Sequence, residues 1–180
     1  MQFQTTRFGL VTVSESDLIT FNEGLLGFSD LRKFVFLDDP NDEIFAWLQS
    51  CERPGVAFPV LEPEFFTTGY KVNLTKSDLE TLGMKAPGLT RIFTIVTIPG
   101  DVTQMTANLK APTVINLNNR TGKQVVASEN DYPIKQPIFL ELQKRVVQNP
   151  QLQFKPASKG HDVAVRLPVN AGSKTPEANA

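Results

Sequence analysis

Side chains that support acid–base or metal chemistry are few in this sequence. It contains one histidine, His161, and one cysteine, Cys51. The two lack the close spacing of zinc or iron ligands, and nothing in the sequence supplies a base that would activate Cys51 as a nucleophile. We therefore expect no catalytic residue, no metal and no cofactor, and we interpret Cys51 as a small packed apolar residue.

Two short segments resemble ion or phosphate sites only superficially. Residues 38–43 are acidic but lack the alternating ligands, central glycine and closing glutamate that define an EF-hand calcium loop. Residues 24–28 contain two glycines, but the Lys-Ser/Thr pair of a phosphate-binding loop does not follow them. We interpret the first segment as a solvated turn and the second as a turn that packs its own leucines.

The net charge of −1 conceals a strong asymmetry along the chain. Residues 1–67 contain 4 Lys and Arg against 11 Asp and Glu, a balance of −7, whereas residues 68–180 contain 14 against 8, a balance of +6. The lack of an overall basic excess argues against direct nucleic-acid binding. The acidic first third is either ordinary solvated surface or a negative surface that attracts a basic protein. The candidate partner-binding carboxylates are Asp38, Asp39, Asp42 and Glu43.

Aromatic residues gather in the segment 62–70, beside proline and glycine. This composition suits either a loop that packs on the core or an interaction edge, and core packing is favoured. If the segment is an interaction edge, its partner-binding residues are Phe65, Phe66 and Tyr70.

Most of the remaining sequence consists of short β-type runs separated by turn residues, which favours a mainly β, antiparallel domain. Gly9 can adopt the positive φ of a tight hairpin between residues 3–6 and 10–13. Residues 92–98 are almost continuously apolar and β-branched, so we expect a central strand with both faces covered. Further strands are expected at 18–21, 34–37, 44–49, 56–61, 113–117 and 124–127, with a hairpin loop at 118–123.

Two helices are expected. In the first, at 75–83, Thr75 or Ser77 can cap the N-terminus and Gly83 can end the helix. The second, at 138–147, repeats apolar residues every four positions and should end before Pro150. With 180 residues and 41% hydrophobic content, we expect one globular domain over residues 1–149. Residues 150–180 are expected to be an extension, flexible from about Ser158.

Three blocks of this sequence resemble the signature of the flagellar assembly factor FliW family. The first is the aromatic-turn-glycine pattern of residues 21–28, and the second runs from Trp47 through Pro54 to Glu62-Pro63. The third and most specific block comprises residues 105–116 with 122–126. The motif residues, which we interpret as structural, are Phe21, Gly24, Gly27, Phe28, Asn108, Ala111, Pro112 and Asn116.

The resemblance implies an antiparallel β-roll or distorted barrel, with one or two short helices and a C-terminal helix. It also implies a non-enzymatic protein that binds flagellin and antagonises CsrA, a small basic RNA-binding translational repressor. Flagellin synthesis would then be coupled to filament assembly; the alternative is a flagellin-binding chaperone without CsrA antagonism. We expect a cytoplasmic protein without direct nucleic-acid or membrane contact, because no apolar run reaches about 18 residues and no export signal is present.

Overall fold

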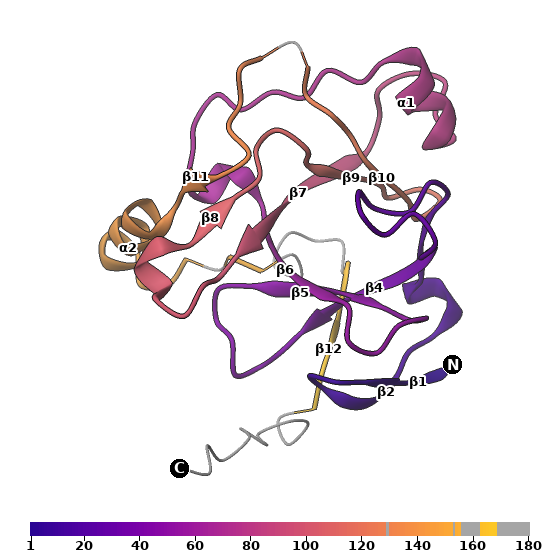
Figure 1. Ribbon diagram of the computed structural model, residues 1–180, viewed down its shortest axis with the longest axis horizontal. Helices are drawn as coiled ribbons and strands as arrows, with labels where there is room; N and C mark the ends of the chain where they lie inside the picture. Colours follow the sequence, from indigo (N-terminus) through magenta and orange to yellow (C-terminus); the bar gives the residue numbers. More distant parts are fainter. Residues whose placement is uncertain (129, 153, 156–162, 169–180) are drawn as a thin grey trace.

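The computed structural model describes residues 1–128, 130–152, 154–155 and 163–168. Its main feature is a closed barrel of seven strands, in which each strand pairs with the next and β10 pairs with β3 (Figure 1). The strands, in their order around the barrel, are β3 (Ile19–Phe21), β4 (Lys33–Asp38), β5 (Ala46–Ser50), β6 (Ala57–Leu61), β7 (Thr90–Thr97), β9 (Thr113–Asn116) and β10 (Thr121–Gln124).

The number of strands in the barrel determines how the barrel closes. Successive barrel neighbours from β3 to β10 are antiparallel. Because the number of strands is odd, the two that close the barrel run in the same direction, and β3 and β10 do pair in parallel. The expected mainly β, mostly antiparallel and barrel-like fold is thus confirmed, with a parallel pair where the barrel closes.

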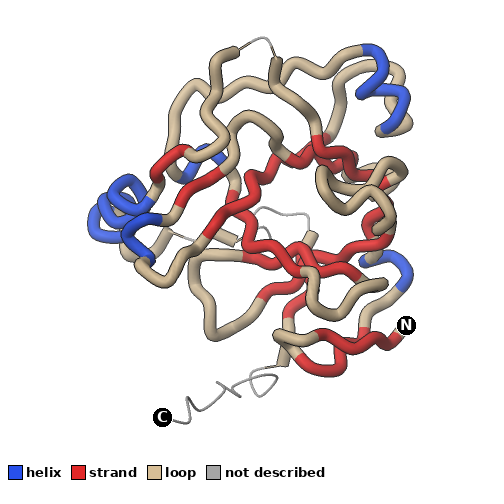
Figure 2. The backbone as a smooth tube through the Cα atoms, in the orientation of Figure 1, coloured by secondary structure: helices blue, strands red, loops and turns tan. Residues whose placement is uncertain are grey.

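The remaining elements surround the barrel. The β1–β2 hairpin packs near the β4–β5 pair, and α2 lies at the opposite side of the molecule from α1 (Figures 1 and 2). Short strands β8 and β11 extend the sheet beyond β7. These elements are β1 (Gln2–Thr5), β2 (Gly9–Thr12), η1 (Glu15–Asp17), η2 (Pro63–Phe65), α1 (Lys76–Thr81), η3 (Val102–Gln104), β8 (Thr106–Ala107), β11 (Gln136–Pro137), α2 (Phe139–Gln148) and β12 (Ala164–Arg166).

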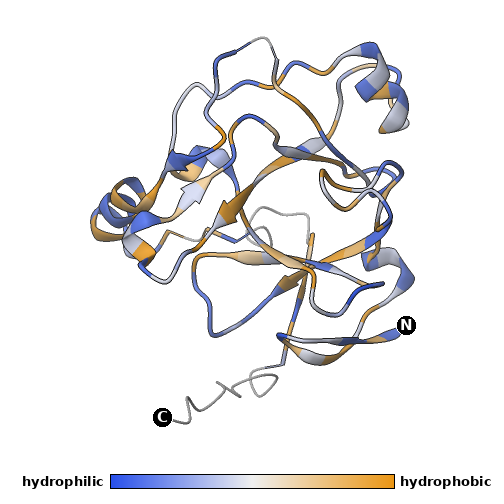
Figure 3. Cartoon of the chain, in the orientation of Figure 1, coloured by the Kyte–Doolittle hydropathy of each residue, from blue (hydrophilic) through white to orange (hydrophobic). Residues whose placement is uncertain are grey.

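The core divides into an interior and several outer layers. The interior cluster fills the barrel, where Phe21 and Phe34 make an edge contact with ring centroids 5.3 Å apart. A second cluster lies between η2, β8 and α2, and a third lies between the hairpin and the outer face of β4 and β5. Figure 3 shows orange, hydrophobic colour along β7 and the β4–β5 pair. None of the described helices is long and apolar enough to cross a membrane.

Local sequence signals account well for the first hairpin and for both helices. Gly9 has φ +71° at the β1–β2 turn. Helix α1 begins after Thr75, whose hydroxyl accepts a hydrogen bond from the Asp78 amide at 3.1 Å, and it is followed by Gly83 at φ +67°. Helix α2 ends at Gln148, before Pro150. The predictions of the first hairpin and of the two helices are thus confirmed.

Strand β10 begins earlier than predicted. The expected loop 118–123 is shorter, because Arg120 takes a positive φ of 53° and the Asn119 side chain accepts the Thr121 amide at 3.0 Å. The strand can then include Gly122, whose missing side chain leaves room for Phe21. A Cβ at Gly122 would lie 2.5 Å from the Phe21 ring, so any other residue there would force Phe21 or the strand to shift.

The C-terminal extension contains an ordered strand, and the prediction of a flexible tail from about Ser158 is wrong for residues 163–168. Strand β12 pairs in parallel with β4, and Val163 and Leu167 on either side of it are 2% and 5% exposed. Phe154 is buried as well, in the cluster that includes Phe65. No periodic pattern marks so short a strand, and its partner lies far away in the sequence. Ser158 itself lies outside the described residues.

Candidate functional site

The acidic turn that follows β4 is tied into the fold. Asp38 is only 3% exposed and pairs with Lys155, and its second oxygen lies 3.7 Å from Nε of Arg166. Our expectation that Asp38 contributes to a negative surface is therefore corrected: its charge is balanced internally by the C-terminal extension. A buried carboxylate requires such compensation, because burial of an unpaired charge is costly.

The other carboxylates of this turn mostly hold its backbone. Asp39 accepts a hydrogen bond from the Asn41 amide at 2.9 Å. Asp42 accepts from the amides of Ile44 and Phe45, at 3.0 and 2.9 Å, and from the indole N–H of Trp47 at 3.3 Å. Glu43 is exposed. Of the four predicted acidic residues, Glu43 therefore presents its carboxylate most fully to solvent.

The aromatic segment packs on the core, as favoured from its composition. Phe65 and Phe66 are 5% and 4% exposed, and the Phe65 ring lies 4.9 Å from that of Phe154. Tyr70 is half-buried against Tyr132, and its hydroxyl donates to the Leu109 carbonyl at 2.6 Å. Burial raises the pKa of Tyr70. The two phenylalanines therefore do not form an exposed interaction edge in this conformation.

The first family block forms a tight turn. Gly24 and Gly27 have φ of +68° and +82°, and Leu25 and Phe28 form a bridge with backbone hydrogen bonds of 3.3 and 2.8 Å. A Cβ at Gly24 would lie 2.5 Å from the Phe28 carbonyl oxygen. Both glycines are thus required by backbone geometry, while Phe28 packs on the interior cluster together with buried Phe21.

The third family block holds the chain segments directly before and after β9. The Asn108 side chain accepts the amides of Lys110 and Ala111, both at 3.0 Å. The Pro112 carbonyl accepts the Val125 amide at 2.9 Å. Asn116, 3% exposed, donates to the carbonyl of Leu82 at 3.0 Å and so attaches α1 to the barrel. These contacts explain the motif residues by the local fold that they hold.

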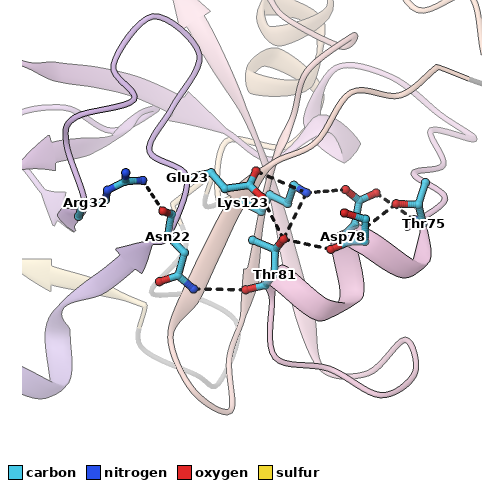
Figure 4. A network of polar contacts seen from close by, with 8 residues as sticks. Asn22, Glu23, Arg32, Thr75, Asp78, Thr81 and Lys123 are labelled. Carbon is cyan, nitrogen blue, oxygen red and sulfur yellow. Dashed lines mark hydrogen bonds and ion pairs between the residues drawn. The ribbon is translucent and has the colours of Figure 1, made fainter.

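A polar network joins α1 to β10 and to the first family block (Figure 4). Nζ of Lys123 lies 2.9 Å from Asp78 and 3.6 Å from Glu23. Thr81 donates its hydroxyl proton to Glu23 at 3.1 Å or to Ser77 at 3.0 Å. Burial alone would raise the pKa of Asp78, but hydrogen bonds from Thr75 and Lys123 outweigh it and lower that pKa. The network is a structural clamp that sequence reasoning did not identify.

A cavity of about 390 Å³ opens between η2 and the start of β7. At its wall Arg91 pairs with Glu62, and the two residues are 9% and 8% exposed. The Arg91 guanidinium carbon also lies 5.5 Å from the centre of the Phe93 ring. The lining residues are Glu62, Pro63, Glu64, Leu89, Thr90, Arg91, Ile92 and Leu117.

The cavity lining combines apolar side chains with the buried Glu62–Arg91 ion pair and with the polar side chains of Glu64 and Thr90. Such a lining suits recognition of another molecule. Sequence reasoning missed Arg91. The available signal was a single charged residue next to the apolar run 92–98.

The described residues contain no group of three or more His, Cys, Asp or Glu side chains that could hold a metal ion. Burial, together with the neighbouring Glu52 carboxylate, raises the pKa of the Cys51 thiol to about 12, against a smaller lowering effect of Lys33. The thiol therefore stays protonated at neutral pH and is a weak nucleophile. It packs beside the hairpin cluster, whereas His161 lies outside the described residues.

The barrel and its motif residues correspond to a known family. The sequence model of the family described as FliW protein matches residues 2–138, which include every strand of the barrel. The chain belongs to the FliW family. A solved structure, described as the crystal structure of the flagellar assembly factor FliW, matches with a TM-score of 0.70 and 31% identity. That match covers 76% of this chain and 96% of the solved chain.

Several curated FliW proteins are similar over most of their length. A flagellar assembly factor FliW of Bdellovibrio bacteriovorus is 59% identical over 169 residues, which is 94% of this chain and 97% of that protein. One of Alkaliphilus metalliredigens is 35% identical, over 89% of this chain and 98% of that protein. The FliW resemblance of the three sequence blocks is therefore confirmed.

Proposed function

We propose that this FliW-family protein is a non-enzymatic flagellar assembly factor that binds flagellin and antagonises CsrA in the cytoplasm. The observation that supports the proposal most strongly is the family match over residues 2–138, which spans the whole barrel. The cavity lining, which is apolar apart from the Glu62–Arg91 pair and a few polar groups, is compatible with protein recognition.

In this proposal the two partners act in sequence. Flagellin occupies the protein while it accumulates in the cell. Export of flagellin frees the protein, which then captures CsrA and relieves repression of flagellin synthesis. Each step of this cycle is the binding or release of a protein. The proposed function therefore requires a recognition surface and no catalytic group.

The surface proposed for CsrA is negative, because CsrA is a basic protein. Glu43 and Glu64 are exposed, whereas Asp38 is buried and Asp42 half-buried, so Glu43 and Glu64 are the better candidates. The segments that carry them meet in one hydrophobic cluster, which contains Phe45, two residues after Glu43, and Phe65, next to Glu64. At physiological salt these carboxylates repel phosphates only within a screening length of about 8 Å. We therefore infer that CsrA docks close to them.

The test is release of a fluorescent RNA from its complex with CsrA, followed by anisotropy at physiological salt. The full-length protein should release the RNA. Its Glu43→Lys/Glu64→Lys variant should need on the order of tenfold more protein for half-release, because two attractive charges become repulsive. The matched control is Glu15→Lys/Glu80→Lys, which makes the same change of charge on η1 and α1 and should behave like the parent.

The possible results test the assignment of the Glu43/Glu64 surface and the antagonism of CsrA separately. Equal release by Glu43→Lys/Glu64→Lys and the parent would reject the assignment of this surface. Failure of the parent protein to release RNA would reject CsrA antagonism, and flagellin binding would then be the function left to test. A weakened control variant would show that total charge matters and that the location does not.

A further inference from the structure

Strand β12 covers part of β4 that the barrel itself leaves open. Strand β3 pairs with β4 only at its start, where Ile19 lies opposite Phe34 and Thr20 opposite Lys33. Beyond that point β12 takes over and pairs in parallel with residues 36–38. Without β12, this half of β4 would be an exposed strand edge, whose unpaired backbone groups accept another strand readily.

This covering strand lies outside the part of the chain that defines the family. The family match ends at Ile138, whereas β12 begins at Ala164. The match to the Bdellovibrio protein covers 169 of the 180 residues, a span that necessarily includes residues 163–168. The barrel thus has an edge on β4 that this chain covers with a segment of its own.

Few contacts attach β12 to the barrel. Val163 inserts into the interior cluster and Leu167 into the cluster beneath the hairpin. The Leu167 amide donates to the Asp38 carbonyl at 3.0 Å. Arg166 is exposed, with its Nε 3.7 Å from the Asp38 carboxylate. A three-residue ladder with two apolar anchors belongs to the less stable end of a fold and can open locally.

We propose that the edge of β4 at residues 36–38 is a strand-acceptor site, filled in cis by residues 163–168 and open to an extended segment of a partner protein in their place. The partner segment adds to the sheet by β-augmentation, in which backbone hydrogen bonds give affinity and side-chain pockets give specificity. It runs parallel to β4, as β12 does.

The chain's own strand defines the chemistry of the partner segment. The occupied site accepts one apolar residue in the Val163 pocket and another four positions later in the Leu167 pocket. A basic residue directly before the second apolar residue meets the Asp38 carboxylate, as Arg166 does. An extended segment of the form apolar-small-apolar-basic-apolar fits the site. This inference holds whether or not the protein binds CsrA.

The test weakens the pairing of the chain's own β12 with β4 and adds a separate peptide that can take the place of β12. Because the Leu167 amide donates to β4, parallel pairing makes the Val165 amide, two residues earlier, the equivalent donor, and Val165→Pro removes it. The probe is a fluorescein-labelled peptide with the sequence of residues 163–168, titrated into the full-length chain. It should bind Val165→Pro on the order of tenfold or more tighter than the parent, in which the tethered strand competes at high effective concentration.

Two altered peptides are the controls. A peptide with proline at the position of Val165 should bind Val165→Pro at least about tenfold more weakly, because it loses a ladder hydrogen bond. A peptide with glutamate at the position of Arg166 should also bind more weakly, by a smaller factor, because Arg166 is exposed where it faces Asp38. If Val165→Pro lacks the near-UV circular dichroism of the parent, Leu167→Ala replaces it. Equal binding of the peptide to parent and variant, binding to neither, or binding of all three peptides alike would overturn the proposal.

Discussion

Lys155 forms an ion pair with Asp38 at the end of β4, where Asp38 is 3% exposed, and the same ammonium donates to the Asp39 carbonyl at 2.5 Å. The contact joins the C-terminal extension to the barrel across most of the chain length. It also removes Asp38 from the candidate surface, because this carboxylate is buried and paired, while Glu43 of the same turn stays exposed.

Loss of Lys155 should therefore destabilise the whole domain. Lys155→Met leaves the buried Asp38 carboxylate with the exposed Arg166 as its remaining ion-pair partner among the described residues, and we expect a loss of up to about 3–5 kcal/mol in the free energy of unfolding. Urea unfolding measures it. The control is Lys144→Met on α2, whose 3.2 Å pair with Glu141 is exposed and should be worth less than about 1 kcal/mol. Equal losses for the two variants would contradict the internal role of the Asp38 pair.

Closure of the barrel should depend on the missing side chain of Gly122. Gly122→Ala places a Cβ 2.5 Å from the Phe21 ring, and relieving that overlap should cost about 1–3 kcal/mol of unfolding free energy. Gly100→Ala, where a Cβ meets nothing within 4 Å, should be neutral or slightly stabilising. Thermal unfolding of the two variants compares them directly. Equal stability of Gly122→Ala and the parent would contradict the steric requirement for glycine beside Phe21.

The Asp78–Lys123 clamp should make stability depend on pH in the acid range. The pKa of Asp78 in the folded protein lies below its ordinary value of 3.8, so the unfolded chain binds more protons in this range. The contribution of Asp78 is therefore complete above about pH 4 and is lost as the pH falls through the lowered pKa.

Asp78→Asn tests this dependence. It should lower the unfolding free energy by about 1–3 kcal/mol at pH 7, and the difference from the parent should shrink below pH 4. The control is Glu80→Gln on the exposed face of the same helix. A difference between Asp78→Asn and the parent that stays constant from pH 7 to pH 3 would show that the lowered pKa of Asp78 does not contribute to stability.

Elements whose signals are local were predictable from the sequence. Gly9 sets the first hairpin, and Thr75 with Asp78 sets the start of α1, because each signal acts within a few residues. Strand β12 was not predictable, since its pairing with β4 depends on a contact between distant parts of the chain. The shift of β10 has a different cause, namely a positive φ at Arg120 where asparagine or glycine is the usual choice.

The same distinction applies to the candidate site. Asp38 and Glu43 are close in the sequence and both acidic, but Asp38 is buried at the end of β4, where it pairs with Lys155 of the extension, whereas Glu43 is exposed in the turn that follows. The core packing of Phe65 follows from its apolar character and was favoured in advance. Composition thus identified an acidic region, while only tertiary contacts determine which carboxylates a partner can reach.

We propose that this FliW-family protein recognises two protein partners. Titration calorimetry of the full-length protein against CsrA, and separately against flagellin, from the same organism tests it most directly. We predict micromolar or tighter binding to each. Binding to flagellin alone would contradict the antagonism of CsrA, and heats indistinguishable from dilution for both partners would contradict the proposed function as a whole.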